Sequence, residues 1–143
     1  MTTPDDHRIL LRRAIALAAE ARESGNPPFG SLLAAPDGTV LAEDCNTTLT
    51  DRDITAHPEL KLARWAAREL DAATAAATTM YTSCQPCSMC EAAIQQAGLR
   101  RVVFALSSEQ LLAIRPGSGR PPVRQEGPAL LEEVREVMEP YYG

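Results

Sequence analysis

Apolar side chains recur along the chain with two different periods, which separate the predicted helices from the predicted strands. Over residues 5–24 the spacing is helical, because the apolar residues stand three or four positions apart. Two short apolar runs follow at residues 31–35 and 39–45, and Pro36-Asp37-Gly38 stands between them. A tight-turn sequence between two such runs predicts an antiparallel hairpin. We therefore expect an amphipathic helix followed by a two-stranded hairpin.

The rest of the chain alternates helices with strands. A polar loop is expected at residues 47–55 and an Ala-rich connection at residues 71–77. The expected helices are 57–70, 87–97, 107–114 and 128–138, and the expected strands are 78–82, 101–106 and 123–126. Residues 115–122 are rich in Arg, Pro and Gly, which predicts a surface loop. This order predicts an α/β fold, a three-layer α/β/α sandwich around a central mixed sheet of about five strands.

Composition narrows the class of protein. The length of 143 residues fits a single domain, residues 1–143, and 45% hydrophobic with 23% charged residues is typical of a globular chain. A net charge of −5 argues against a dedicated nucleic-acid partner, since such a partner usually needs a basic face. No apolar run approaches the roughly 18 residues of a membrane-spanning helix, and the N-terminus does not resemble a signal peptide. We expect a cytoplasmic protein with no membrane partner.

Two short motifs carry the candidate chemistry: His57-Pro58-Glu59 and Pro86-Cys87-Ser88-Met89-Cys90. A catalytic zinc site uses three nitrogen or sulfur ligands and leaves the fourth position to water. Cys87 and Cys90 stand three positions apart, so one helical turn brings both sulfurs to the same side. With His57 as the third ligand, these residues predict one zinc ion per chain. The reducing cytoplasm favours this metal site over a disulfide.

Glu59 stands too close to His57 in sequence to bind the same metal easily, but near enough to reach water at the open position. A carboxylate placed beside such a water can accept and return its protons. We therefore expect Glu59 to be the catalytic residue.

Three other residues compete for these roles. Cys84 continues the spacing of three and is an alternative partner for Cys87, but Pro86 marks a helix start and leaves Cys84 in the preceding loop. We therefore expect Cys84 not to be a ligand, and Cys45, at a strand end, to be a packed side chain. His7, in the first turn of a helix, is expected to be exposed and not a ligand or a base.

Several segments resemble a known family. Thr55–Glu59, Tyr81–Cys90 and Pro28-Phe29-Gly30 are similar to the cytidine/deoxycytidylate deaminase superfamily, and most closely to its bacterial guanine deaminase and nucleoside deaminase branch. H-x-E followed by P-C-x-x-C is the signature of zinc-dependent nucleobase deaminases. The similarity runs from about residue 8 to residue 106.

The resemblance implies the cytidine deaminase fold, a homodimer or higher oligomer, and a small heterocyclic amine as substrate. It also implies that Phe29 and Asn46 line the substrate pocket. An aromatic ring can lie against a flat heterocycle, and an amide offers its edge a donor and an acceptor. Relatives further suggest an aromatic lid over this site or a neighbouring subunit's site, so Tyr141-Tyr142 is either a lid or a frayed end.

The expected activity is hydrolytic removal of an exocyclic amine as ammonia from a free nucleobase, nucleoside or related heterocycle, with water as co-substrate and guanine-like substrates favoured. Zinc lowers the pKa of a bound water to about 7, and Glu59 would carry the protons. One alternative is a tRNA adenosine deaminase, which would be expected to carry a basic C-terminal helix. Residues 131–139 instead contain four glutamates and one arginine. Another alternative is a non-catalytic, zinc-stabilised interaction domain.

Pro58 departs from the family, which usually carries Ala in an H-A-E triplet. In relatives the N–H of that Ala typically bonds the substrate, and proline has no N–H to donate. The resemblance is therefore a better guide to the reaction than to the substrate.

Overall fold

The structure, a computed structural model, describes residues 4–117 and 119–143. Its elements, in chain order, are α1 (Pro4–Glu23), β1 (Gly30–Ala34), β2 (Val40–Cys45), α2 (Pro58–Glu69), α3 (Ala72–Ala77), β3 (Thr79–Cys84), α4 (Ser88–Gln96), β4 (Arg101–Leu106), α5 (Ser108–Ile114) and α6 (Leu131–Tyr142). Every helix and strand expected between residues 5 and 114 is present.

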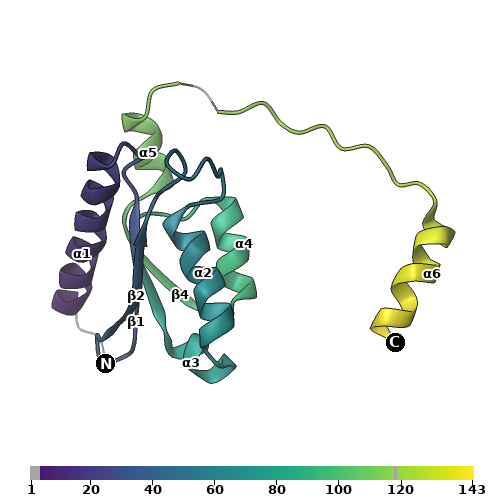
Figure 1. The fold of residues 1–143 in the computed structure, drawn as a ribbon, viewed down its shortest axis with the longest axis horizontal. Coiled ribbons are helices and arrows are strands. Elements are labelled where there is room, and N and C mark those ends of the chain that lie inside the picture. The colour runs from purple at the N-terminus through teal and green to yellow at the C-terminus, as the bar shows by residue number, and fades with distance from the viewer. Residues whose placement is uncertain (1–3, 118) are drawn as a thin grey trace.

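The four strands form one mixed sheet in the order β2-β1-β3-β4 (Figure 1). β1 pairs antiparallel with both β2 and β3, and β3 pairs parallel with β4. The turn at Pro36-Asp37-Gly38 closes the expected hairpin: Gly38 has a φ of +90°, which favours glycine, and the Thr39 N–H donates to the Asp37 carboxylate at 2.9 Å.

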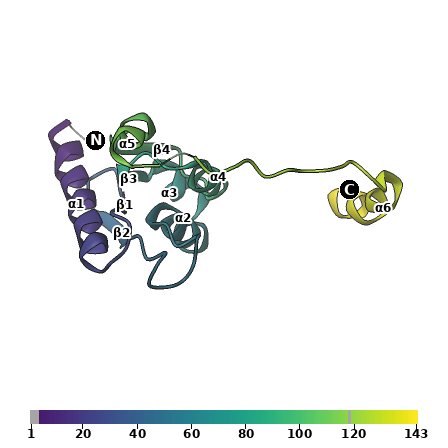
Figure 2. The same ribbon diagram turned by 90° about the horizontal axis from the view of Figure 1, so that it is seen from above.

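Helices cover both faces of the sheet. Leu32 of β1 stands opposite Tyr81 of β3, and this pair belongs to the core on the side of α1. The next pair, Leu33 and Met80, points to the other face, where α2 and α4 complete a second core. Figures 1 and 2 show α1 on one side of the strands and α2 and α4 on the other. The expected three-layer α/β/α sandwich is confirmed.

Helix α1 lies directly on β1 at Gly30. A methyl group added there would lie 2.4 Å from the Ala14 carbonyl oxygen and 2.5 Å from the Ala18 backbone nitrogen. Only a residue without a side chain permits this approach. Because Gly30 begins the central strand, the contact fixes how deeply α1 settles on the sheet.

The structure differs from the sequence-based expectation in three places. Within the expected connection, Ala72–Ala77 forms α3, because alanine has a high helix propensity and the N-cap Asp71 accepts from the Thr74 N–H at 2.8 Å. The prediction of an edge strand at residues 123–126 is wrong: these residues form no strand, and the sheet has four strands where about five were expected. The last helix begins at Leu131, not at residue 128, and continues to Tyr142.

Residues 115–143 form a C-terminal arm that ends in α6. Figures 1 and 2 both show α6 standing apart from the rest of the molecule, and every described residue from Leu112 onward is exposed. Tyr141 and Tyr142 therefore lie in a helix, and not in a frayed end or over this chain's own site. None of the described helices is both long and apolar enough to cross a membrane.

Replacing Gly30 by alanine should destabilise the fold, because the new methyl group would force α1 away from β1. We expect a loss of about 1–3 kcal/mol in the free energy of unfolding, the usual cost of overpacking, measured by urea denaturation. Gly119→Ala is the matched control, since nothing lies within 4 Å of the added carbon. Equal unfolding midpoints for the two variants would contradict the close approach.

Candidate metal centre and active site

Two helices begin side by side at the candidate metal centre. His57 is the N-cap of α2 and Cys87 is the N-cap of α4, and both have extended backbone conformations. Pro58 occupies the start of α2, where a missing N–H costs no helical hydrogen bond. Neither His57 nor Cys87 uses its side chain to cap its own helix, so both side chains remain available to a ligand.

The sequence-predicted ligand atoms meet. His57 Nδ1 lies 3.4 Å from the Cys90 sulfur and 3.7 Å from the Cys87 sulfur, and all three ligand atoms lie within 4.8 Å of one another. Zinc–sulfur bonds of about 2.3 Å and zinc–nitrogen bonds of about 2.0 Å in a tetrahedron place ligand atoms at such separations. A nitrogen and two sulfurs form a donor set that suits zinc.

The pKa shifts of His57 and Cys90 also fit a cation. Burial raises the pKa of the Cys90 thiol far above its usual range, and the nearby charge of Glu59 adds to this effect. Burial lowers the pKa of His57, and the charge of Arg120 lowers it further, so the imidazole is held neutral. A neutral imidazole is a ligand, and a bound cation offsets the cost of forming the buried thiolate.

Glu59 stands in the first turn of α2 and is only 6% exposed. Burial raises the pKa of its carboxyl group, which favours a group that can hold a proton as well as accept one. The Ser31 hydroxyl donates to a Glu59 oxygen at 3.5 Å and also bonds the Thr82 hydroxyl at 2.7 Å. Two central strands therefore support the carboxylate from below.

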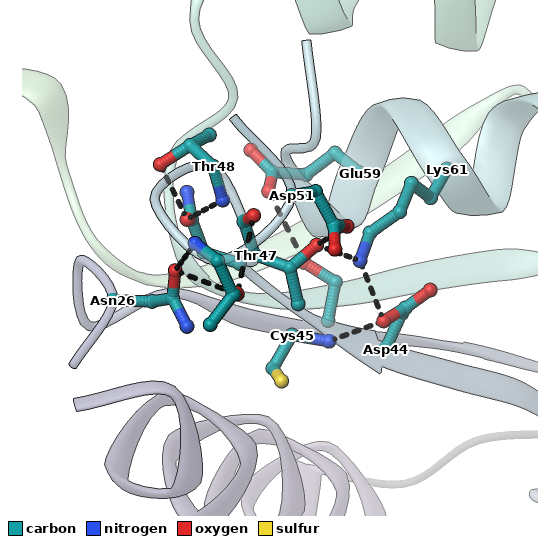
Figure 3. A network of polar contacts seen from close by, with 11 residues as sticks. Asn26, Asp44, Cys45, Thr47, Thr48, Asp51, Glu59 and Lys61 are labelled. Atoms are coloured by element: carbon teal, nitrogen blue, oxygen red, sulfur yellow. Dashed lines mark hydrogen bonds and ion pairs between the residues drawn. The ribbon is translucent and has the colours of Figure 1, made fainter. Parts of the chain in front are cut away.

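A polar network holds the loop that leads to His57 (Figure 3). The side-chain oxygen of Asn26 accepts from the N–H groups of Leu49 and Thr50, both at 3.1 Å. Lys61 of α2 donates to Asp44 and to Thr47, both at 2.9 Å. These bonds join the end of α1, strand β2 and helix α2 to the loop, so the position of His57 is set from several elements.

A cavity of about 90 Å³ opens beside His57, Glu59 and Cys87. Its lining residues come from the loop before β1, the end of β2, the start of α2, the β3–α4 connection and α5: Phe29, Asn46, His57, Pro58, Glu59, Cys84, Gln85, Cys87, Leu111 and Arg115. Phe29 and Asn46, both predicted to contact substrate, are joined because the Asn46 N–H donates to the Phe29 carbonyl at 2.9 Å. The structure thus gathers every predicted site residue except the buried Cys90 at one cavity.

A larger groove of about 440 Å³ lies elsewhere, between β2 and α2. Its charged residues are of both signs, three basic and three acidic, and none of the candidate metal ligands lines it. The chemistry therefore belongs to the smaller cavity.

The competing residues have other roles. Cys84 lines the cavity but lies outside the metal-ligating group, and all four cysteines are free thiols. His7 is not the exposed residue that the sequence predicts: it is half-buried, its Nδ1 lies 2.6 Å from the Tyr81 hydroxyl, and its Nε2 lies 3.2 Å from Arg101. It therefore ties the start of α1 to the sheet.

Sequence reasoning missed Gln85, Leu111 and Arg115 in the cavity wall and Asn26 behind it. Gln85 stands next to a ligand motif, which is a usable signal. Leu111 and Arg115 belong to no motif, and they reach the cavity only because α5 packs at the carboxyl end of the sheet. Asn26 follows a helix end, where an asparagine in a turn would not stand out.

Comparison with known proteins gives a family match over residues 4–106, to the cytidine and deoxycytidylate deaminase zinc-binding region. A probable cytosine deaminase of Schizosaccharomyces pombe is 36% identical over 115 residues, which is 78% of this chain and 67% of the relative. A tRNA-specific adenosine deaminase of Haemophilus influenzae is 30% identical over 105 residues, 73% of this chain and 61% of the relative.

A guanine deaminase of Bacillus subtilis is 39% identical over 101 residues, 70% of this chain and 64% of the relative. The solved structure of guanine deaminase from the same organism superposes with a TM-score of 0.76 and 27% identity, over 95% of this chain and 93% of that chain. The sequence matches span about two thirds of the length of the curated relatives.

Serine substitutions test which thiols hold the metal. Cys87→Ser and Cys90→Ser should each weaken zinc binding by more than about 100-fold, because changing a residue that only hydrogen-bonds to a metal ligand already costs about 10–100-fold. Cys84→Ser and Cys45→Ser should bind one zinc per chain, as the unaltered protein does. Metal content and competition with a chromogenic chelator measure this, and loss of zinc in Cys84→Ser would reassign the ligand set.

Proposed function

Because the chain belongs to the cytidine and deoxycytidylate deaminase family, as its motifs predict, we propose that it removes an exocyclic amine hydrolytically from a small heterocycle. The observation that carries this proposal is the buried carboxyl group of Glu59 at the wall of a cavity shared with His57 and Cys87. The family match is to a zinc-binding region, which confirms the expected zinc.

In the proposed reaction, His57, Cys87 and Cys90 would hold the zinc ion. Zinc bound by three protein ligands lowers the pKa of a water at its open position to about 7. Glu59 accepts a proton from the attacking water and passes it to the ring nitrogen next to the amine-bearing carbon. The carboxylate then takes the second proton from the hydroxyl group added to that carbon and transfers it to the amine. The carbon–nitrogen bond breaks, and the products are an oxo heterocycle and ammonia. Burial of Glu59 keeps bulk water from competing for these protons.

The size of the cavity supports a small substrate. About 90 Å³ is well below the roughly 300–1,000 Å³ of sites that enclose drug-sized ligands. A single flat heterocycle suits such a cavity, with Phe29 at its wall to lie against the ring. We favour a guanine-like base, because the guanine deaminase structure matches almost the whole chain, with other nucleobases and nucleosides as alternatives.

A tRNA adenosine deaminase is the second candidate, favoured by the 30% identity to the Haemophilus influenzae enzyme. The acidic α6 argues against it, since polynucleotide binding relies on basic side chains. A purely structural zinc site would be closed by four ligands. Among the residues that the structure describes, only three cysteine, histidine or acidic side chains make up the metal-ligating group.

We further propose a homodimer in which α6 packs on a second copy of the chain. A helix of 12 residues is marginal in water by itself, yet α6 exposes an apolar stripe along its length. The stripe and its flanks consist of Leu130, Leu131, Val134, Val137, Met138, Tyr141 and Tyr142, which are 47–83% exposed. Apolar surface of this extent is typical of an interface.

Glu59→Gln should retain zinc and fold but lower kcat for ammonia release by about 10²–10⁴-fold, because the amide cannot accept the water proton. The measurement is an ammonia-release assay across guanine, cytosine, adenosine and their nucleoside or base forms, with zinc content as the control. Undiminished activity in the zinc-loaded variant would exclude Glu59 as the proton carrier.

Placing charge in the apolar stripe tests the dimer. The double variant Val134→Asp with Met138→Asp should be monomeric, because burying two carboxylates in an apolar interface is costly. Glu136→Gln, on another face of α6, should remain dimeric. Sedimentation equilibrium reports both masses, and a monomeric unaltered protein would contradict the proposed assembly.

A further inference from the structure

The amide side chains that line the cavity, Asn46 and Gln85, present hydrogen-bond donors to it, because their oxygens accept hydrogen bonds from other parts of the chain. The Asn46 side-chain oxygen accepts from the Thr48 N–H and from the Thr48 hydroxyl, both at 2.9 Å, so both of its lone pairs are used. Its NH2 group bonds no described residue. Every fully buried side-chain nitrogen or oxygen among the described residues has a hydrogen-bond partner. An NH2 group without a partner is therefore not fully buried, and because Asn46 lines the cavity, its NH2 group is accessible there.

Gln85 is fixed in the same sense. Its side-chain oxygen accepts from the Ser108 N–H at the start of α5, at 2.9 Å. This bond occupies one lone pair of the oxygen and orients the amide, so its NH2 group is available as a donor at the cavity wall. Asn46, after the end of β2, and Gln85, from the β3–α4 connection, therefore both present a donor to the cavity.

Arg115 adds a charged donor to this wall. It is the residue at which α5 ends, and its guanidinium makes no hydrogen bond or ion pair to any residue that the structure describes. Its charge acts on a neighbouring cavity residue: burial raises the pKa of the Cys84 thiol, and the positive charge of Arg115 opposes that rise. Glu59 is the one carboxylate that lines the cavity, and its proposed partner is water.

The backbone does not supply a donor at the neighbouring position. Pro58 is fully buried in the wall between His57 and Glu59 and has no N–H. Substrate oxygens can therefore be bound here by side chains, and a guanidinium is the strongest such donor available.

We propose that Arg115 is a specificity-determining residue, which together with Asn46 and Gln85 selects heterocyclic amines that carry an oxo group. This inference rests on the proposed deaminase function and names the class of substrate. The side-chain donors at the wall offer no acceptor to a second amine, whereas an oxo oxygen accepts from the guanidinium. Adenine-type bases, which carry no oxo group, should be poor substrates.

Matched substrate pairs test the inference without assuming the ring system. Guanine and 2-aminopurine differ in an oxo group, as do cytosine and 4-aminopyrimidine. The unaltered enzyme should prefer the oxo member of whichever pair it uses. Arg115→Gln should raise KM for that member about 10–100-fold, the usual loss when a charged donor is removed, with kcat little changed. For the member without the oxo group, kcat/KM should change less than about twofold.

Two variants control the result. Arg124→Gln removes an arginine that is 87% exposed, pairs with Glu126 at 2.8 Å and does not line the cavity, and it should behave as the unaltered enzyme. Arg115→Lys keeps a charged donor and should recover part of the preference. An unchanged preference in Arg115→Gln, or an equal loss for both members of a pair, would overturn the role of Arg115.

A binding measurement separates this inference from the proposed function. In the zinc-loaded Glu59→Gln protein, calorimetry should show that adding Arg115→Gln weakens binding of the oxo heterocycle about 10–100-fold. Turnover by the unaltered enzyme without this weakening would sustain the deaminase and overturn the inference. Binding that weakens as expected, in a protein that releases ammonia from none of the four compounds, would sustain the role of Arg115 and overturn the function.

Discussion

The structure depends on two helices starting at one place. His57 at the start of α2 and Cys87 at the start of α4 meet because both helices lie on the same face of the sheet. They follow β2 and β3, the two strands that flank β1. Only three residues separate the end of β3 at Cys84 from α4, so the sheet itself fixes the height of Cys87. The longer loop before α2 has no such restraint, and the bonds from Asn26 and Lys61 supply it. A shift of either helix start would separate the imidazole from the sulfurs.

The sequence predicts the elements whose signals are local. The helical spacing before residue 24, the hairpin turn at residues 36–38 and the i, i+3 spacing of Cys87 and Cys90 each act over a few residues, and the structure contains all three. The strand expected at residues 123–126 is absent because a strand needs a partner, and β-propensity alone does not provide one. No local signal predicts Leu111 and Arg115 as cavity residues for a similar reason: their place in the cavity wall depends on how α5 packs.

The C-terminal arm carries an amphipathic helix that packs on neither core of this chain. The apolar spacing in residues 130–142 predicts an amphipathic helix, and α6 forms. The same pattern normally indicates a face packed on a core, but α6 stands apart from both cores in Figures 1 and 2. The sequence therefore predicts the helix and its apolar face. In the proposed homodimer, a second copy of the chain supplies the surface that covers this face.

The boundary between what the family determines and what this chain determines falls near residue 106. The family match covers residues 4–106, which include the candidate metal ligands and Glu59, the groups to which we assign the proposed reaction. Leu111 and Arg115 line the same cavity from beyond that boundary. Pro58 strengthens this division, because a proline well suited to starting α2 removes a backbone donor from the wall and leaves recognition to side chains. A change of side chain on α5 would alter the cavity wall without replacing a candidate metal ligand.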